Sequence, residues 1–404
     1  MDKLNQVCRL YKSLKREITE LKNEINSLKL RRQNLFVLTY LIDLLIEREQ
    51  NKDIIPFDNL MTNMKLNEIV AFSSYQVDYQ HVIKSIECLF SNCFFIKDGI
   101  YKYADRYIFW GTALSPENTD LLKNLLIDKS KKFSFAELGL ISRISLANPG
   151  KNHQFSQSYS YMIDDFAPYY DARYKTRLEM LLNSYDVSND ERNRAKKCIG
   201  LILDNFITKY NDQPLTEVNL GIHKKKVLVV DQVKGDMSIL KGGANDDTFE
   251  IMLSDAIKEN PDADIIVKTH PVSVDLGFSK VSGYYSETKS DNRVIIYNEK
   301  INPISLLKNI DKVYVCTSQL GLEALFCKKE VITYGIPFYA GWGLTKDKQK
   351  CKRRLRERTL EELFFIVYIL YTRYCDPETL KNIEIEDAIQ DIIEKRREFF
   401  ESYV

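Results

Sequence analysis

Two short polar motifs have the clearest chemical potential in this chain, and each follows a run of residues typical of a buried strand. Lys226–Asp231 leads into Gln232–Asp236 (QVKGD), and Asp264–Lys268 leads into THP at 269–271. In an open α/β sheet, ligands bind in the crevice outside the carboxyl ends of the strands. A carboxylate and one of the four histidines are therefore expected at the same rim, as in an active site.

Asp236 and His270 are the main catalytic candidates. A carboxylate in a glycine-containing loop suits a nucleophile or base, and Gln232 is placed to orient it. The alternative for Asp236 is capping of the next segment. Pro271 forces an extended backbone at His270, and an imidazole before a following helix suits phosphate binding. A purely structural role is the alternative for His270.

Two further segments suggest ligand contacts. Cys316–Glu323 (CTSQLGLE) places the hydroxyls of Thr317 and Ser318 at the expected start of a helix. Hydroxyls and free backbone N–H groups at this position bind an anion, or they cap the helix, and the two roles are compatible. The loop Tyr334–Thr345 (YGIPFYAGWGLT) offers ring faces that suit a sugar or a base, although a tight structural corner has the same composition.

Two charged motifs receive blander interpretations. Asp262-Ala-Asp264 mimics the metal-binding DxD of some glycosyltransferases, but it enters a buried strand rather than leaving one. The basic run Lys346–Arg358 is typical of a solvated connector, with lipid phosphate or an anionic glycan as the alternative partner.

The elements that must position these residues are clearest between 222 and 345. Near-continuous Val/Ile runs separated by helical segments predict a parallel sheet that is buried on both faces. The expected strands are 226–231, 264–268, 293–297, 312–317 and 330–335. The expected helices are 248–260, 303–309 and 319–327.

Three other zones complete the predicted α/β organisation. Apolar residues spaced three and four apart from 4 to 28 predict a coiled coil or helical segment over 1–50, which could dimerise, bind a partner or pack on the enzyme. Mixed strands and helices, including a helix over 189–210, predict a first α/β domain at 51–215. A second domain spans 216–350, and 351–404 returns to helix, beginning at the capping box of Thr359.

Composition fits a soluble globular protein and excludes several classes. The chain of 404 residues is 44% hydrophobic and 28% charged, and it has eight scattered cysteines without metal-ligand spacing. The net charge of +1 argues against a dedicated nucleic-acid binder. The longest apolar run, 35–46, is shorter than the ~20 residues that cross a bilayer. These features predict a cytoplasmic protein.

Several segments together resemble the capsule polysaccharide synthesis proteins, specifically the retaining β-Kdo glycosyltransferases. The matching segments cover about 130–390 in order and at similar spacing. They are FAELGLISRI (135–144), YMIDDFAPYYDARYKTRLEMLL (161–182), ITKYN (207–211), VLVVDQVKGDMSILKGGA (227–244), KTHP (268–271) and VYVCTSQLGLEALFCKKEVITYGIPFYAGWGLT (313–345). Leu138 departs from the family pattern, in which an acidic residue is common at this position.

The resemblance implies a GT-B-like pair of Rossmann-type domains that transfers one Kdo from CMP-β-Kdo with retention and without a metal. It implies Asp236 as the nucleophile, His270 as the donor-phosphate ligand, Gln232 as an orienting residue and Glu137 as a candidate base. The segment 51–215 would hold the acceptor, 216–350 would hold the CMP-sugar, and the tail would pack back on both. The implied donor-binding residues are Lys268, Pro271, Thr317, Ser318, Gln319, Glu323 and Gly243. The remaining candidates, on the acceptor side and elsewhere, are Arg143, Asp165, Tyr339 and Trp342.

The acceptor stays open at this stage. It is a phosphatidylglycerol-linked capsule primer or the end of an O-antigen chain, and the heptads favour the chain terminator slightly. Both acceptors are built at the cytoplasmic face of the inner membrane, so peripheral association is expected. The alternatives are a transferase for another CMP-sugar such as sialic acid, or a coiled-coil scaffold that only binds a nucleotide or glycan.

Overall fold

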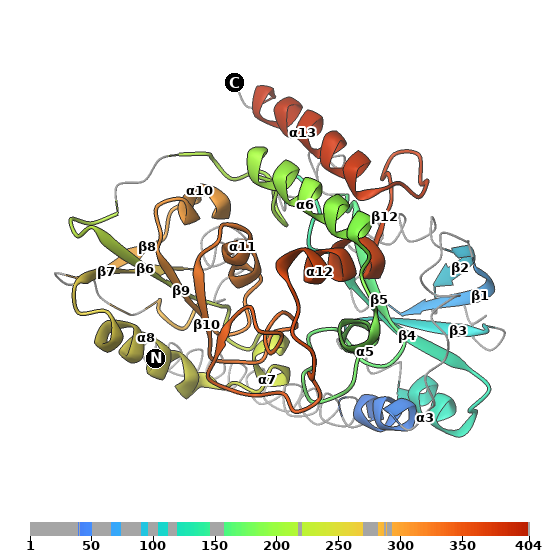
Figure 1. The fold of residues 1–404 in the computed structure, drawn as a ribbon. Helices are drawn as coiled ribbons and strands as arrows, with labels where there is room; N and C mark the ends of the chain where they lie inside the picture. The colour runs from blue at the N-terminus through green and yellow to red at the C-terminus, as the bar shows by residue number, and fades with distance from the viewer. Residues whose placement is uncertain are drawn as a thin grey trace, which may run out of the picture.

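The fold contains two six-stranded sheets with helices around them (Figure 1). The computed structural model describes residues 39, 41–50, 66–73, 90–95, 104–111, 119–145, 157–216, 220–269, 282–286, 288 and 293–402. The predicted heptads at 4–28 lie outside these residues. No helix in the described part of the chain combines the length and apolar character that crossing a membrane requires.

The first sheet combines parallel and antiparallel strands in the order β12-β5-β4-β3-β1-β2. Strands β2, β1, β3 and β4 run parallel, whereas β5 pairs antiparallel with both β4 and β12. The bounds are β1 Leu66–Ser73, β2 Phe90–Phe95, β3 Arg106–Trp110, β4 Lys132–Leu138, β5 Ser160–Asp164 and β12 Thr372–Tyr374. The described strands of the predicted first domain, 51–215, therefore belong to one sheet, to which the tail adds β12.

The second sheet is parallel throughout, in the order β11-β10-β9-β6-β7-β8. The bounds are β6 Lys225–Val230, β7 Ala263–Lys268, β8 Val294–Tyr297, β9 Lys312–Val315, β10 Glu330–Thr333 and β11 Lys346–Asp347. The chain winds from β6 through β7 to β8 on one side and returns to β9 on the other. The ends of β6 and β9 therefore form a topological switch point, where ligands bind in such sheets.

Alternate residues of β6 explain why both faces of this sheet are covered. Val227 and Val229 pack with the apolar side of α8 (Asp246–Glu259). Leu228 and Val230 belong to the large core that includes α10 (Pro303–Leu307) and α11 (Leu320–Phe326). Figure 1 shows α8 and α11 on opposite sides of the sheet.

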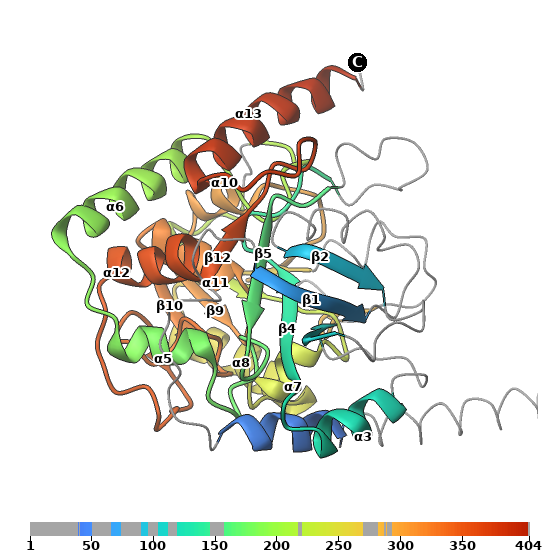
Figure 2. The same ribbon diagram turned by 90° about the vertical axis from the view of Figure 1, so that its right-hand side faces the viewer.

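The first sheet has its own helices, which include α3 (Thr119–Ile127), α5 (Arg177–Ser184) and α6 (Asn189–Asp204). Residues 41–50 are helical and pack against α3 through one core cluster (Figure 2). The predicted helix 189–210 is too long. It ends at Asp204, because Asn205 is the C-cap and Phe206 takes a left-handed conformation with φ of 54°.

The C-terminal tail returns to the first sheet. The sequence predicts a helical tail, whereas the structure has a strand there as well as helices. Thr359 caps α12 (Leu360–Phe364), a π-helix follows at Phe365–Tyr371, and then β12 pairs with β5. The last helix, α13 (Ile385–Glu401), lies beside α6 in Figures 1 and 2, and Glu386 of α13 accepts hydrogen bonds from Arg194 of α6 at 2.8 Å. The tail thus connects the second sheet back to the first.

Candidate active site between the two sheets

Asp236 lies at the carboxyl edge of the second sheet, in the loop between β6 and the short helix α7 (Met237–Lys241). Gly235 turns the chain before it with φ of 82°. The Asp236 side chain is exposed and accepts a hydrogen bond from the backbone N–H of Ser238 at 2.8 Å. Asp236 therefore caps α7, which is the alternative role that the sequence suggested. The cap uses Oδ1, and Oδ2 has no hydrogen-bond partner among the described residues.

Gln232 contacts Thr317 across the switch point rather than Asp236. Its Nε2 donates to Thr317 Oγ1 at 3.0 Å, and its Oε1 accepts from the backbone N–H of Thr317 at 2.9 Å. Thr317 Oγ1 lies 3.2 Å from Ser238 Oγ, next to the cap of Asp236. Gln232 therefore links the loops after β6 and β9, and its orienting role stays a prediction.

A buried pair of charged residues lies behind these loops. Asp231 and Lys268 end neighbouring strands and are 1% and 6% exposed. Burial raises the pKa of Asp231 to about 6 and lowers the pKa of Lys268 to about 8. Asp231 Oδ1 accepts from the backbone N–H groups of Gln232 and Tyr284, but Oδ2 has no partner among the described residues.

Asp231 was not selected from the sequence, although an acidic residue ending a Val-rich strand is a usable signal.

Lys268 donates to the backbone carbonyl of Thr269 at 2.9 Å. His270 and Pro271, the expected phosphate ligand and its neighbour, lie outside the described residues. Their assignment stays a prediction.

Glu137 comes from β4 of the first sheet, whereas Asp236 follows β6 of the second. The pKa of the Glu137 carboxyl is raised to about 7, mainly by burial, and the negative charge of Asp236 contributes to this rise. The charges of Lys209 and Lys241 and a hydrogen bond from Tyr170 act in the opposite direction. Asp236 and Glu137 are thus close enough for their charges to interact, although they belong to different sheets.

Gly111 makes room for the Glu137 carboxyl. It follows β3 with φ of 55°, and a Cβ atom there would lie 2.6 Å from Glu137 Oε1. A side chain at this position would displace the carboxyl.

Two expected donor ligands instead join the two halves of the site. Gln319 Nε2 donates to the backbone carbonyl of Leu140 at 3.0 Å. Glu323 is buried in α11, and desolvation raises its pKa to about 8, while the charge of Lys209 from the first domain opposes this shift. In this structure, both side chains are therefore directed toward the first domain.

Ser318 and Gly243 also have structural partners. Ser318 Oγ accepts from the backbone N–H of Leu320 at 3.3 Å, whereas the N-cap of α11 is Gln319, whose side chain makes no capping hydrogen bond. Gly243 has φ of 73°, and its carbonyl accepts from Gln349 at 2.8 Å. The seven-residue helix α11 is short, so its dipole adds little to anion binding.

The aromatic loop is a structural corner, which corrects the expectation that its rings form a sugar platform. Tyr339 and Trp342 are both 0% exposed. Tyr339 donates to the carbonyl of Ser318 at 2.5 Å, and Trp342 Nε1 donates to the carbonyl of Phe338 at 2.8 Å. Buried rings with satisfied polar groups have no face available for a ligand.

The two remaining acceptor-side candidates differ in their surroundings. Asp165 forms a salt bridge with Arg177 at 2.6 Å, which indicates a structural role. Arg143 is 6% exposed, and its side chain has no hydrogen-bond or ion-pair partner among the described residues. Its backbone is held by Asn211, whose Nδ2 donates to the Arg143 carbonyl at 2.9 Å, and by Lys209, whose carbonyl accepts from the Arg143 N–H at 3.2 Å.

The charged motifs are mainly structural. Arg353 donates to Glu179 at 2.7 Å, Arg354 to the Ala340 carbonyl at 2.6 Å, and Arg358 to the Leu182 carbonyl at 2.7 Å. Asp264 accepts from His223. Within the described ranges, no group of three or more His, Cys, Asp or Glu side chains has the arrangement of a metal site.

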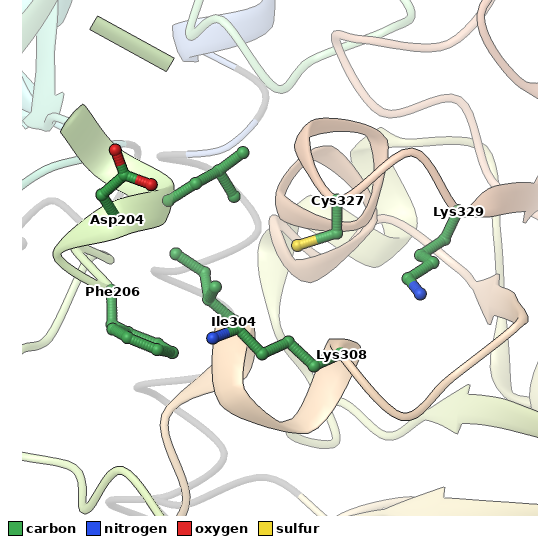
Figure 3. A pocket seen from close by; sticks show the side chains of 7 residues that line it. Asp204, Phe206, Ile304, Lys308, Cys327 and Lys329 are labelled. Atoms are coloured by element: carbon green, nitrogen blue, oxygen red, sulfur yellow. The ribbon is translucent and has the colours of Figure 1, made fainter. Parts of the chain in front are cut away.

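A separate cavity of about 440 Å³ lies between α6, α10 and α11 (Figure 3). Its lining residues are Leu203, Asp204, Phe206, Ile304, Lys308, Cys327 and Lys329. Cys327 follows the last residue of α11, whereas Ser318 precedes its first. The cavity is therefore at the opposite end of this helix from the candidate active site.

Solved structures with the same fold include two that are named Thermosulfurimonas dismutans KpsC. Its beta Kdo 2,4 transferase is 33% identical with a TM-score of 0.70, and the match covers 80% of this chain and 98% of that one. Its beta Kdo 2,7 transferase is 26% identical with a TM-score of 0.59, over 81% and 100% of the two chains.

Curated relatives agree with this likeness. A capsule polysaccharide modification protein, LipA, of Neisseria meningitidis serogroup B is 36% identical over 74% of this chain. The chain spans 42% of that relative's length. A lipopolysaccharide-processing protein, LpsZ, of Rhizobium meliloti is 34% identical over 71% of this chain and 63% of its own length. The family model described as capsule polysaccharide biosynthesis protein matches residues 162–374. The chain therefore belongs to the capsule polysaccharide biosynthesis protein family.

Proposed function

We propose that this protein is a retaining glycosyltransferase that moves β-Kdo from CMP-β-Kdo to a glycan acceptor in bacterial surface polysaccharide synthesis. The observation that carries the proposal is that two carboxyls from different sheets, Asp236 and Glu137, lie close enough for their charges to interact. Asp236 is exposed, with one oxygen unpaired among the described residues, and burial raises the pKa of Glu137 to about 7. The likeness to the KpsC β-Kdo transferases supports Kdo as the transferred sugar.

In the first step, Asp236 attacks the anomeric carbon of Kdo. A carbon–oxygen bond forms to the carboxylate as the bond to the CMP phosphate breaks, and the electron pair leaves on the phosphate oxygen. His270 and Lys268 stabilise that phosphate in our proposal. Fixed donors of this kind neutralise developing charge without reorganisation, so the proposed reaction needs no metal.

In the second step, a hydroxyl of the acceptor attacks the same carbon and displaces Asp236. Two inversions at one carbon give net retention. Glu137 removes the proton from the attacking hydroxyl. A base with a pKa of about 7 is well matched to this task near neutral pH.

The acceptor is a lipid-linked glycan in this proposal, either a capsule primer or an O-antigen chain. The names of the relatives include both capsule and lipopolysaccharide processing, which is consistent with both acceptors. Such acceptors are membrane-bound, so we propose that the protein works at the cytoplasmic face of the inner membrane.

Intact-protein mass spectrometry tests the proposal directly. The wild type and the Asp236→Ala variant are incubated with CMP-β-Kdo generated in situ. We expect the wild type alone to gain the mass of one Kdo, mapped to the peptide that contains Asp236. An adduct with another CMP-sugar but not with CMP-β-Kdo would replace the donor. An unmodified wild type that also releases no CMP would reject the transferase.

A further inference from the structure

A buried ion pair joins the two sheets beside the candidate site. Lys241 Nζ lies 3.3 Å from Asp171 Oδ2, and the two side chains are 2% and 0% exposed. Lys241 is the last residue of α7, which follows β6 of the second sheet. Asp171 lies between β5 and α5 of the first domain. No candidate role from the sequence involves either residue.

Backbone and side-chain contacts strengthen this junction. The backbone N–H of Ala172 donates to the carbonyl of Lys241 at 2.9 Å. Arg173 donates to both oxygens of Asp171 at 2.9 and 2.8 Å, which fixes the carboxylate in one orientation. Arg173 also donates to Asp43 at 3.1 Å, in the helix of residues 41–50. One carboxylate therefore contacts two cations, one in each domain.

Both reacting carboxyls are adjacent to this junction. Asp236 caps the start of α7, and Lys241 ends it, so the two are separated by a helix of five residues that spans roughly 7.5 Å. On the other side, Tyr170 directly precedes Asp171 and donates to the Glu137 carboxyl. Lys241 Nζ lies 6.0 Å from the centre of the Tyr170 ring. A shift at the ion pair would therefore change the separation of Asp236 and Glu137.

A buried ion pair is a poor source of stability, because desolvation of two charges offsets their attraction. Burial lowers the pKa of Lys241, and the charge of Asp171 acts against this shift. What the pair provides well is a fixed geometry, because loss of Asp171 leaves the buried Lys241 without its counter-charge, and loss of Lys241 leaves Asp171 held by Arg173 alone. The pair lies next to the segments that carry Asp236 and Glu137, so its fixed geometry bears on the distance between these two carboxyls.

We propose that Asp171 and Lys241 are positioning residues, forming an interdomain latch that holds Asp236 opposite Glu137 during transfer. The role of the latch in transfer rests on the proposed function. The latch itself is a structural property that can be measured without substrate. Through Arg173 and Asp43, it also includes the N-terminal helix.

The test compares Asp171→Asn, Lys241→Met, the double variant of both, and Lys241→Arg. We expect Asp171→Asn and Lys241→Met each to reduce Kdo transfer by about a hundredfold, which is the effect of a displacement of roughly 1 Å between reacting groups. The effect should fall on kcat more than on the KM for CMP-β-Kdo, because neither residue is among the proposed ligands of the donor phosphate. Lys241→Arg keeps a cation and should restore part of the rate.

The double variant separates positioning from folding. It leaves no unpaired buried charge, so its unfolding midpoint should return toward that of the wild type. Transfer should stay slow in the double variant. Recovery of both the midpoint and the transfer rate would overturn the latch and leave a structural ion pair only.

Hydrogen exchange provides a measurement that needs no activity. In Asp171→Asn and in the double variant, we expect faster exchange at 170–174 and 237–243 than in the wild type. The control is Lys348→Met, which breaks an exposed pair with Glu259 at 2.9 Å in the second domain and should leave both segments unchanged. Unchanged exchange in Asp171→Asn would overturn the proposal. A wild type without transferase activity would reject the proposed function, while the exchange data would still decide the latch.

Discussion

Four ionisable side chains at the candidate site have pKa values that desolvation shifts toward the neutral range. Burial raises the pKa of Asp231 to about 6, of Glu137 to about 7 and of Glu323 to about 8, and it lowers the pKa of Lys268 to about 8. Shifted pKa values of this kind concentrate at functional sites. The four groups come from both sheets, so the protonation of the site depends on how the sheets meet.

Glu137 provides a prediction at this scale, with a defined pH dependence. A base must be ionised to accept a proton, so transfer should fall about tenfold per pH unit below its pKa and level off above it. With a pKa of about 7, the slope should appear on the acid side of neutrality. Glu137→Gln should abolish the slope, slow transfer about a thousandfold and let the Kdo–Asp236 adduct accumulate. The rates and adduct masses are measured from about pH 5.5 to 8.5.

The control for this prediction is Glu259→Gln, which changes a surface carboxylate of the second domain that hydrogen-bonds Tyr314. It should keep the wild-type profile. A Glu137→Gln enzyme with the wild-type rate and slope would remove Glu137 from the mechanism.

Among the elements, the C-terminal tail shows how a short strand can depend on a side-chain contact. Tyr371 ends the π-helix before β12, and its hydroxyl donates to Asp164 Oδ2 at the end of β5 at 2.9 Å. Asp164 also accepts from the backbone N–H of Arg177 at 3.0 Å, at the start of α5. One buried carboxylate thus joins the tail, a strand and a helix.

Tyr371→Phe should therefore destabilise the protein by about 1–2 kcal/mol, because the buried Asp164 carboxylate loses one of its hydrogen-bond donors. Tyr374 provides a matched control three residues later, since its buried hydroxyl has no partner in the described structure. Tyr374→Phe should leave stability unchanged or slightly higher, because it removes an unsatisfied polar group. Chemical denaturation at neutral pH measures both. Equal losses in the two variants would contradict the assigned hydrogen bond.

The sequence predicts the elements of the second sheet well, because continuous Val/Ile runs are buried on both faces of a parallel sheet. It misses β12, because Thr372–Tyr374 follows an apolar run, FIVYILY, whose pattern favours helix. It also gives no strand order, because the pairing of β6 with β9 is set by contacts distant in the chain.

The same limit applies to the candidate site. Asp236 and its loop are recognisable from local sequence. The partner of Gln232 is 85 residues away, so no local pattern indicates that its amide holds Thr317. A loop with rings such as Tyr339 and Trp342 has the same composition whether it forms a sugar platform or a structural corner. Only the packing of the rings distinguishes these two alternatives. The latch is invisible to sequence patterns, because Asp171 and Lys241 meet only when both domains are folded.

At the scale of the whole molecule, few side chains hold the two sheets together at the site. Gln319 with Leu140 and Lys241 with Asp171 are the contacts described above, and the tail provides the covalent return to the first sheet. Away from the site, one apolar core contains residues of both domains, among them Leu140 and Leu181 of the first and Leu228 and Leu322 of the second. The helix of residues 41–50 belongs to the first domain, because it packs on α3 in one apolar cluster.

The heptads at 4–28 precede this docked helix, and an apolar stripe of this spacing is typical of a two-stranded coiled coil. We expect the full chain of 47.2 kDa to form a dimer and a variant that lacks 1–33 to be monomeric, as measured by size-exclusion chromatography with light scattering. The truncated protein keeps Asp43 and its contact with Arg173, so its unfolding midpoint and its transfer to a soluble acceptor should match those of the full chain. A monomeric full chain, or a truncated dimer, would assign these heptads to a different partner. Loss of transfer on truncation would instead show that the segment acts on the site itself.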